Sequence, residues 1–148
     1  MTIVVAAAVI EDDGRYFVTR RQPGVHLEGY WEFPGGKCEP GESLAACLAR
    51  EMREELGTAI AVGAEIFTVA HDYPDRRVEL HFLACHLLSE PQPCLGQEMR
   101  WVAREDLAAL RFPPADDALG KTGIDLGTGR SPLVGASFRT AADRRSAR

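Results

Sequence analysis

The sequence predicts an α+β fold: a mixed β-sheet covered by helices in an αβα sandwich. An uninterrupted apolar run at residues 3–10 has the length of a buried strand. One segment of strong helix formers, residues 44–56, lies between a capping serine and a glycine. Further strand-like segments follow before a short second helix. This order of elements, two strands, a helix, several strands and a helix, favours layers of helix and sheet around one core.

Each expected element is bounded by turn residues. The first strand ends in a hairpin-type turn at residues 11–14, and residues 15–21 form the second strand. The other expected elements are loops at 22–30 and 33–42, strands at 61–71 and 77–88, a loop at 89–96, a short strand at 98–103 and a short helix at 104–110. From about Gly120 the apolar periodicity stops, so we predict a domain at residues 1–119 and a mobile tail at 120–148.

Composition restricts the class of protein and its partners. The chain has 148 residues, 45% of them apolar and 26% charged, which fits one globular domain with a sizeable core. The net charge of −5 gives no basic field for a nucleic-acid polymer, so any nucleotide partner is expected to be small. The N-terminal apolar run is too short to span a membrane and lacks the basic flank of a signal peptide. Four scattered cysteines indicate reduced thiols. We expect a cytoplasmic protein, a monomer or weak dimer, that does not bind membranes.

The helix at residues 44–56 carries an unusual acidic face. Ser43 is a suitable N-cap, and Gly57 stands where a left-handed C-terminal glycine belongs. At 100° per residue, three glutamates share one face of this helix: Glu51, Glu54 and Glu55. The opposite stripe, expected to face the core, consists of Ala45, Leu48, Ala49, Met52 and Leu56.

Clustered glutamates have two interpretations. Like charges at i,i+4 destabilise a helix by a few tenths of a kcal/mol, and anions near its C-terminal end oppose the helix dipole. A bound hard cation such as Mg²⁺ would reverse this repulsion. The alternative is an ordinary solvated face in which neighbouring arginines pair with the acids. The helix alone leaves both interpretations open.

The sequence pattern around the helix favours the interpretation that the glutamates bind a metal ion. Gly36 is followed after five residues by Glu42, and after seven more by the run from Arg50 to Gly57. This spacing resembles the Nudix box, G-x5-E-x7-R-E-U-x-E-E-x-G-U, in which U is aliphatic; Thr58 departs from it only at the last position. The segments "FVTRRQPGVHLEGYWEFPGGK", "YPDRRVELHFL" and "FPPADDAL" resemble MutT-type members of the Nudix hydrolases, which cleave nucleoside triphosphates. The resemblance covers roughly residues 3–119.

The resemblance implies a reaction and a set of residues. Water attacks a phosphorus of a nucleoside triphosphate, giving NMP and pyrophosphate, with Mg²⁺ (Mn²⁺ possible) neutralising the phosphates. The implied metal ligands are Glu51, Glu54, Glu55, a backbone carbonyl of Gly35 or Gly36, and Glu98. Glu51 is favoured as the general base, with Glu54 and Glu98 open. Arg50 belongs to the catalytic set, and we expect it to hold the box together by a charge-assisted contact with Glu42.

Substrate identity depends on residues outside the helix. The resemblance assigns substrate binding to Arg21, His26, Glu32, Phe33, Pro34, Gly35, Lys37, Arg76 and Asp116. Members specific for 8-oxoguanine typically have asparagine where this chain has Asp116, and an ionised aspartate only accepts hydrogen bonds. It could accept two from the N1–H and N2–H₂ edge of guanine or one from the cytosine amino group, so we expect 8-oxo-dGTP first and (d)CTP or a 5-substituted form as a close second. Two weaker alternatives are another Nudix activity, on dinucleoside polyphosphates or ADP-ribose, and a non-catalytic nucleotide-binding module.

Overall fold

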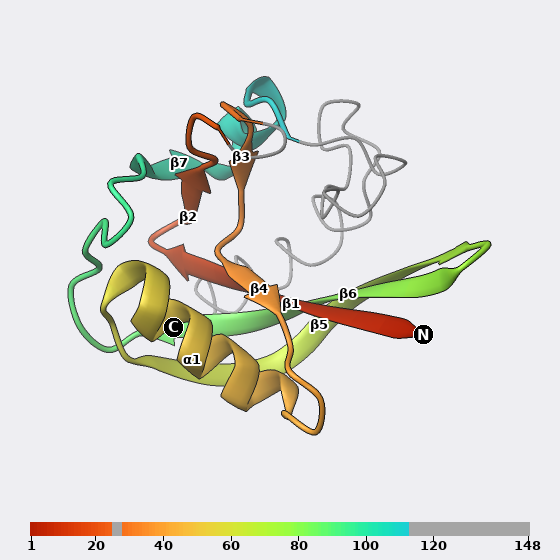
Figure 1. Ribbon diagram of the computed structural model, residues 1–148. Helices are drawn as coiled ribbons and strands as arrows, with labels where there is room; N and C mark the ends of the chain where they lie inside the picture. The colour runs from red at the N-terminus through yellow and green to blue at the C-terminus, as the bar shows by residue number, and fades with distance from the viewer. Residues whose placement is uncertain (25–27, 113–148) are drawn as a thin grey trace. The chain divides into compact units, whose positions relative to one another are not determined.

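Strand β1 (Thr2–Asp12) takes part in two sheets of the computed structural model, which describes residues 1–24 and 28–112 (Figure 1). The chain divides into two compact units. The first unit is Met1–Ile10 with Phe33–Gly96; the second joins Glu11–Glu32 to the segment that starts at Gln97. The predictions for His26, Asp116 and the tail at 120–148 lie outside the described residues.

The first unit contains the predicted mixed sheet. Strand β1 runs parallel to β6 (Arg76–Leu87), and β6 is antiparallel to β5 (Ile60–Tyr73). On its other side β1 is antiparallel to the short strand β4 (Gly35–Lys37), which gives the order β4-β1-β6-β5. Strand β1 is buried from Val5 to Ile10, as its continuous apolar run predicts. Sequence analysis placed β4 in a loop, because a Gly-Gly-Lys strand has no apolar alternation.

Helix α1 (Leu44–Leu56) has the predicted bounds and contacts β4 and β5 of the first unit. Its N-cap is Ser43, and Gly57 adopts the left-handed conformation with φ of 56°. Leu48, Met52 and Leu56 are buried, as predicted. The expectation for Ala45 was wrong: Ala45 is exposed, and Cys47 is buried in its place. The Cys47 thiol donates to the Gly36 carbonyl oxygen at 3.7 Å.

Removing the N-cap is expected to weaken the fold measurably. The Ser43 hydroxyl oxygen accepts a hydrogen bond from the Ala46 backbone N–H at 3.1 Å. Ser43→Ala leaves that donor unsatisfied and should lower the free energy of unfolding by about 1 kcal/mol. Urea denaturation measures the change. Ser43→Asp, which preserves the cap, serves as the control and should retain most of the stability. Equal midpoints for wild type and Ser43→Ala would contradict the assignment.

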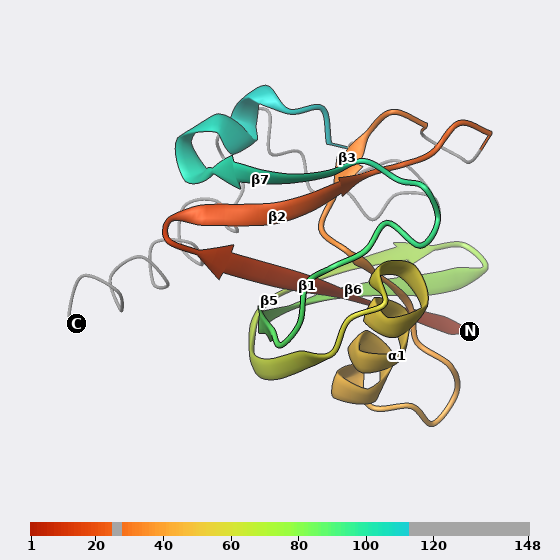
Figure 2. The same cartoon turned by 90° about the vertical axis from the view of Figure 1, so that its left-hand side faces the viewer.

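The second unit is built around the hairpin that follows β1. Its turn has positive φ at Asp13 (53°) and Gly14 (77°), the pattern of a type I′ turn. Strand β2 (Arg15–Arg20) is antiparallel to the end of β1, to β7 (Met99–Ala103) and to β3 (Trp31–Glu32) (Figure 2). A 3₁₀ helix, η1 (Arg104–Ala109), follows β7 where a short helix was predicted. The two-residue strand β3 was not predicted.

Two further properties concern the cysteines and the helices. All four cysteines are free thiols. Within residues 1–24 and 28–112, no helix is both long and apolar enough to cross a membrane.

Candidate active site

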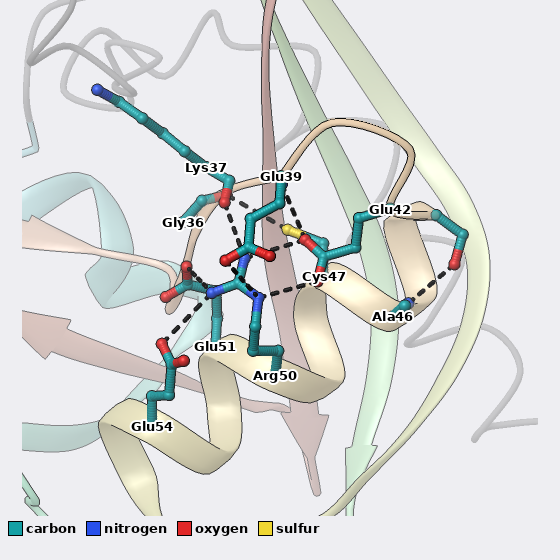
Figure 3. Close-up of polar contacts among 10 residues, drawn as sticks. Gly36, Lys37, Glu39, Glu42, Ala46, Cys47, Arg50, Glu51 and Glu54 are labelled. Carbon is teal, nitrogen blue, oxygen red and sulfur yellow. Dashed lines mark hydrogen bonds and ion pairs between the residues drawn. The ribbon is translucent and has the colours of Figure 1, made fainter.

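Arg50, a half-buried residue of α1, is the centre of the candidate site. Its Nε and Nη2 donate to the two carboxylate oxygens of Glu42 at 2.8 and 3.0 Å. Its Nη1 donates to Glu51 at 2.9 Å and to Glu54 at 3.3 Å (Figure 3). Nη2 also donates to the backbone carbonyl of Lys37 at 3.0 Å. Only arginine has a planar fork with enough donors for these partners, so this one side chain joins β4, the loop and the helix.

The sequence places these groups together for simple reasons. Glu51 and Glu54 lie one and four residues after Arg50 on α1, and Glu54 therefore stands one turn along the same face. Glu42 ends the loop that enters the helix, and its carboxylate also accepts from the Glu39 backbone N–H at 2.9 Å. The predicted contact between Arg50 and Glu42 is confirmed. The local fold of the box thus depends on this ion pair.

The pairing shifts the titration of both partners. Hydrogen bonds from Arg50 and from the Glu39 backbone lower the pKa of Glu42 to about 2. The same contact with Glu42, supported by Glu51, raises the pKa of Arg50 above its ordinary value. Both groups are therefore ionised throughout the neutral range, and the network stays intact there.

Acid is expected to remove the contribution of Glu42 to stability. Its pKa falls from about 4.5 to about 2 on folding, so its stabilising effect is complete above about pH 4.5 and is lost as the pH falls toward 2. Urea unfolding of wild type and Glu42→Gln tests this: the difference between their midpoints should be largest at pH 7 and should shrink at pH 3. Glu90→Gln, which removes an exposed carboxylate, is the control. A difference that stays constant from pH 7 to pH 3 would contradict this role.

Gly36 makes room for the carboxylate of Glu51. The side chain of Glu51 is only 13% exposed, and a Cβ placed on Gly36 would lie 2.5 Å from its Cδ and within 2.7 Å of both oxygens. Gly35 serves the fold instead, because a Cβ there would lie 2.0 Å from the Ala6 carbonyl oxygen, with φ at 156°. The two adjacent glycines therefore have separate functions.

The oxygen ligands on the acidic face of α1 fit a hard divalent cation. Glu51 lies in the space that Gly36 leaves open, and Glu54 is 60% exposed on the same face. Carboxylate and carbonyl oxygens are the ligands that Mg²⁺ prefers. Glu55 follows Glu54 on α1 and is half-buried. The structure thus brings Gly36, Arg50, Glu51 and Glu54 together as the sequence predicted.

The other predicted residues of the first unit have varied surroundings. Phe33 is buried and packs edge-to-face on Phe82, with ring centroids 6.1 Å apart. Pro34 is buried, and its carbonyl oxygen accepts from the Ala8 backbone N–H at 2.8 Å. The Lys37 side chain is exposed and points away from the carboxylates around Arg50 (Figure 3).

Arg76, also predicted to bind substrate, starts β6 at the turn of the β5–β6 hairpin. This turn projects beyond α1 (Figure 1). The guanidinium lies over the Tyr73 ring at 5.0 Å and pairs with Asp75 at 2.9 Å. Its Nε is buried and has no hydrogen-bond partner among the described residues.

In the described part of the second unit lie three of the predicted residues, Arg21, Glu32 and Glu98. Arg21 donates to Glu32 at 3.2 Å, and burial raises the pKa of the Glu32 carboxyl, a shift that the nearby Arg21 opposes. Glu98 accepts from Arg20 Nη1 at 3.0 Å, and Arg100 approaches its other oxygen at 3.9 Å. Sequence reasoning did not identify Arg20 or Arg100 as partners of Glu98. The signal was the strand register, because β2 pairs with β7 and brings the ends of these strands together.

Comparison with known proteins identifies the family. A family model described as "NUDIX domain" matches residues 5–121. An 8-oxo-dGTP diphosphatase of Haemophilus influenzae is 37% identical over 120 residues, 79% of this chain and 88% of that protein. A CTP pyrophosphohydrolase of Escherichia coli is 38% identical over 119 residues, 77% of this chain and 85% of that protein.

A solved structure agrees with the sequence relatives. The solution structure of the ORF135 protein of E. coli superposes with a TM-score of 0.67 at 33% identity, covering 87% of this chain and 93% of the other. The fold, the intact box and these relatives lead to one conclusion: the chain belongs to the NUDIX domain family and is a Nudix hydrolase.

Proposed function

We propose that the protein is a Mg²⁺-dependent nucleoside triphosphate pyrophosphohydrolase that releases NMP and pyrophosphate, and that its substrate is an oxidised nucleotide such as 8-oxo-dGTP. The observation that carries the proposal is the arrangement around Arg50, which holds Glu51 and Glu54 on one face of α1 beside Gly36. An ordinary solvated face would also pair the acids with arginine, but it would not need the space that Gly36 leaves for the Glu51 carboxylate.

In this proposal the residues divide into ligands and positioning groups. Glu51, Glu54 and Glu55, with a carbonyl of Gly35 or Gly36 and with Glu98, would hold Mg²⁺. When bound, the cation supplies charge neutralisation for the phosphates and lowers the pKa of a water molecule. Arg50 is a positioning residue: it fixes the direction of the Glu51 and Glu54 carboxylates through Nη1.

We assign the general base to Glu51, with Glu54 and Glu98 as the alternatives. Arg50 holds Oε1 of Glu51 at 2.9 Å, which orients the side chain so that Oε2 can accept a proton from water. Glu98 lies in the second unit, where one of its oxygens accepts from Arg20 Nη1 at 3.0 Å. Catalysis by the remaining residues is mainly positioning, as in other phosphoryl transfers.

The identity of the base has two candidates. Relatives of this chain at 37% and 38% identity are an 8-oxo-dGTP diphosphatase and a CTP pyrophosphohydrolase, respectively. Asp116 is compatible with both candidates, because an ionised aspartate could accept two hydrogen bonds from the N1–H and N2–H₂ edge of guanine or one from the cytosine amino group.

A substrate panel tests the proposal. Purified protein is assayed with 8-oxo-dGTP, dGTP, dCTP and CTP in Mg²⁺, with pyrophosphate and orthophosphate measured separately. We expect pyrophosphate, with the highest kcat/KM on 8-oxo-dGTP; a preference for dCTP or CTP would select the second candidate. Asp116→Asn should shift the order of preference, and unchanged relative kcat/KM values would remove Asp116 from the base pocket. No turnover of any substrate with Mg²⁺ or Mn²⁺ would overturn the proposed function.

A further inference from the structure

A second group of ligating side chains lies beside Arg50, on the loop that enters α1. Its members are Cys38, Glu42 and Cys47. Cys38 directly follows β4, and Cys47 lies in the first turns of α1. The two sulfur atoms and one carboxylate oxygen all lie within 4.8 Å of one another. All three residues belong to the first unit, and the proposed hydrolysis uses neither cysteine.

The chemistry of these donors differs from that of the glutamate face. Thiolates select borderline and soft cations such as Zn²⁺, whereas Mg²⁺ prefers oxygen ligands alone. Zinc binds sulfur at about 2.3 Å and carboxylate oxygen at about 2.1 Å, so ligand atoms around a tetrahedral ion lie about 3.5–3.8 Å apart. The three donor atoms, which lie within 4.8 Å of one another, therefore need to approach one another by about 1 Å or less to bind zinc.

The three donors are also partly preorganised. Arg50 and the Glu39 backbone N–H fix the Glu42 carboxylate, and Cys47 is buried with its sulfur beside the Gly36 carbonyl (Figure 3). Cys38 is only half-buried, which gives access from solvent. Two of the three donors are thus held in place and the third, Cys38, is accessible from solvent, so binding an ion requires little reorganisation.

We propose that Cys38, Glu42 and Cys47 form a binding site for a thiophilic divalent cation of the Zn²⁺ class. Each thiol releases its proton to solvent when the ion binds. Because Glu42 is also the bidentate partner of Arg50, an ion that shares the Glu42 carboxylate weakens its pairing with the guanidinium that orients Glu51 and Glu54. The site is therefore coupled to the glutamate face, although binding itself does not depend on the proposed hydrolysis.

Cobalt binding tests the site directly. Metal-free protein in a phosphine reductant, with excess Mg²⁺ to occupy oxygen ligands, is titrated with Co²⁺ while the near-ultraviolet absorption is followed. Wild type should develop the thiolate-to-cobalt charge-transfer band, saturate at one equivalent, and lose the band when Zn²⁺ is added. Cys38→Ser and Cys47→Ala should each abolish the band. Cys94→Ser, which removes one exposed thiol elsewhere, should retain it.

Two outcomes would overturn the proposal. One is the absence of the charge-transfer band in wild-type protein. This outcome requires that a thiol titration in denaturant shows the cysteines of that protein to be fully reduced. The other is a band of undiminished intensity in Cys38→Ser, the decisive variant because Cys38 is not fully buried. Circular dichroism of each variant verifies the fold, so that a loss of binding in Cys47→Ala counts only for folded protein.

Discussion

Replacing Glu54 by glutamine is expected to lower kcat by about two to three orders of magnitude while the fold survives. Glu54 is 60% exposed and contributes a carboxylate to the acidic face, so the amide preserves shape and removes one charge. Under the proposed function, the lost charge would weaken Mg²⁺ binding and the neutralisation of the phosphates. Steady-state kinetics in saturating Mg²⁺ measures the effect, and thermal unfolding verifies the fold.

The control for this substitution is Glu90→Gln. Glu90 is an exposed acid of the same unit outside the box, so its loss should change kcat little. If Glu54→Gln retained activity within tenfold of wild type, Glu54 would not be a metal ligand. A comparable fall in both variants would instead indicate a general effect of net charge.

Replacing Gly36 by alanine is expected to lower kcat by about 100-fold, because a misplacement of about 1 Å in a catalytic group can cost that much. The new methyl group would lie 2.5 Å from Cδ of Glu51, so the carboxylate has to move. The clash is with the end of a flexible side chain, and the backbone should therefore tolerate it. Gly35→Ala, which collides with the Ala6 carbonyl oxygen, should instead prevent folding.

A double-mutant cycle separates this effect from a general disturbance of β4. If Gly36→Ala acts through Glu51, it should add little to the loss already caused by Glu51→Gln. Gly41→Ala is the control for loop strain: nothing lies within 4 Å of its added Cβ, but its φ of 78° strains an alanine, so it reports a backbone disturbance without a clash at Glu51. Independent, additive losses in Gly36→Ala and Glu51→Gln would contradict the role assigned to Gly36.

The helix and the glutamate face could be predicted because their signals are local. Ser43 and Gly57 mark the ends of α1 by their own backbone preferences, and a period of 3.6 residues puts Glu51 and Glu54 on one face. The contact between Arg50 and Glu42 could be predicted from the spacing of the Nudix box. The burial of Cys47 could not, because it depends on how α1 packs against β4 and β5.

What the sequence did not reveal depends on contacts between distant segments. Strand β4 pairs with β1 through a glycine-rich stretch that has no strand-like pattern. The neighbours of Glu98 follow from the register of β2 with β7, in which Val18 lies opposite Arg100. Such registers are set by the whole sheet, and no local pattern encodes them.

The central claim is that the acidic face of α1 binds Mg²⁺ and that the bound ion is required for release of pyrophosphate. The most direct test is the initial rate of pyrophosphate release from 8-oxo-dGTP, and from CTP in parallel, as Mg²⁺ is added to protein freed of metal by a chelator. We predict no pyrophosphate without the ion and a rate that rises to saturation with it. A rate that is unaffected by the chelator, or the absence of pyrophosphate from both nucleotides at saturating Mg²⁺, would contradict the claim.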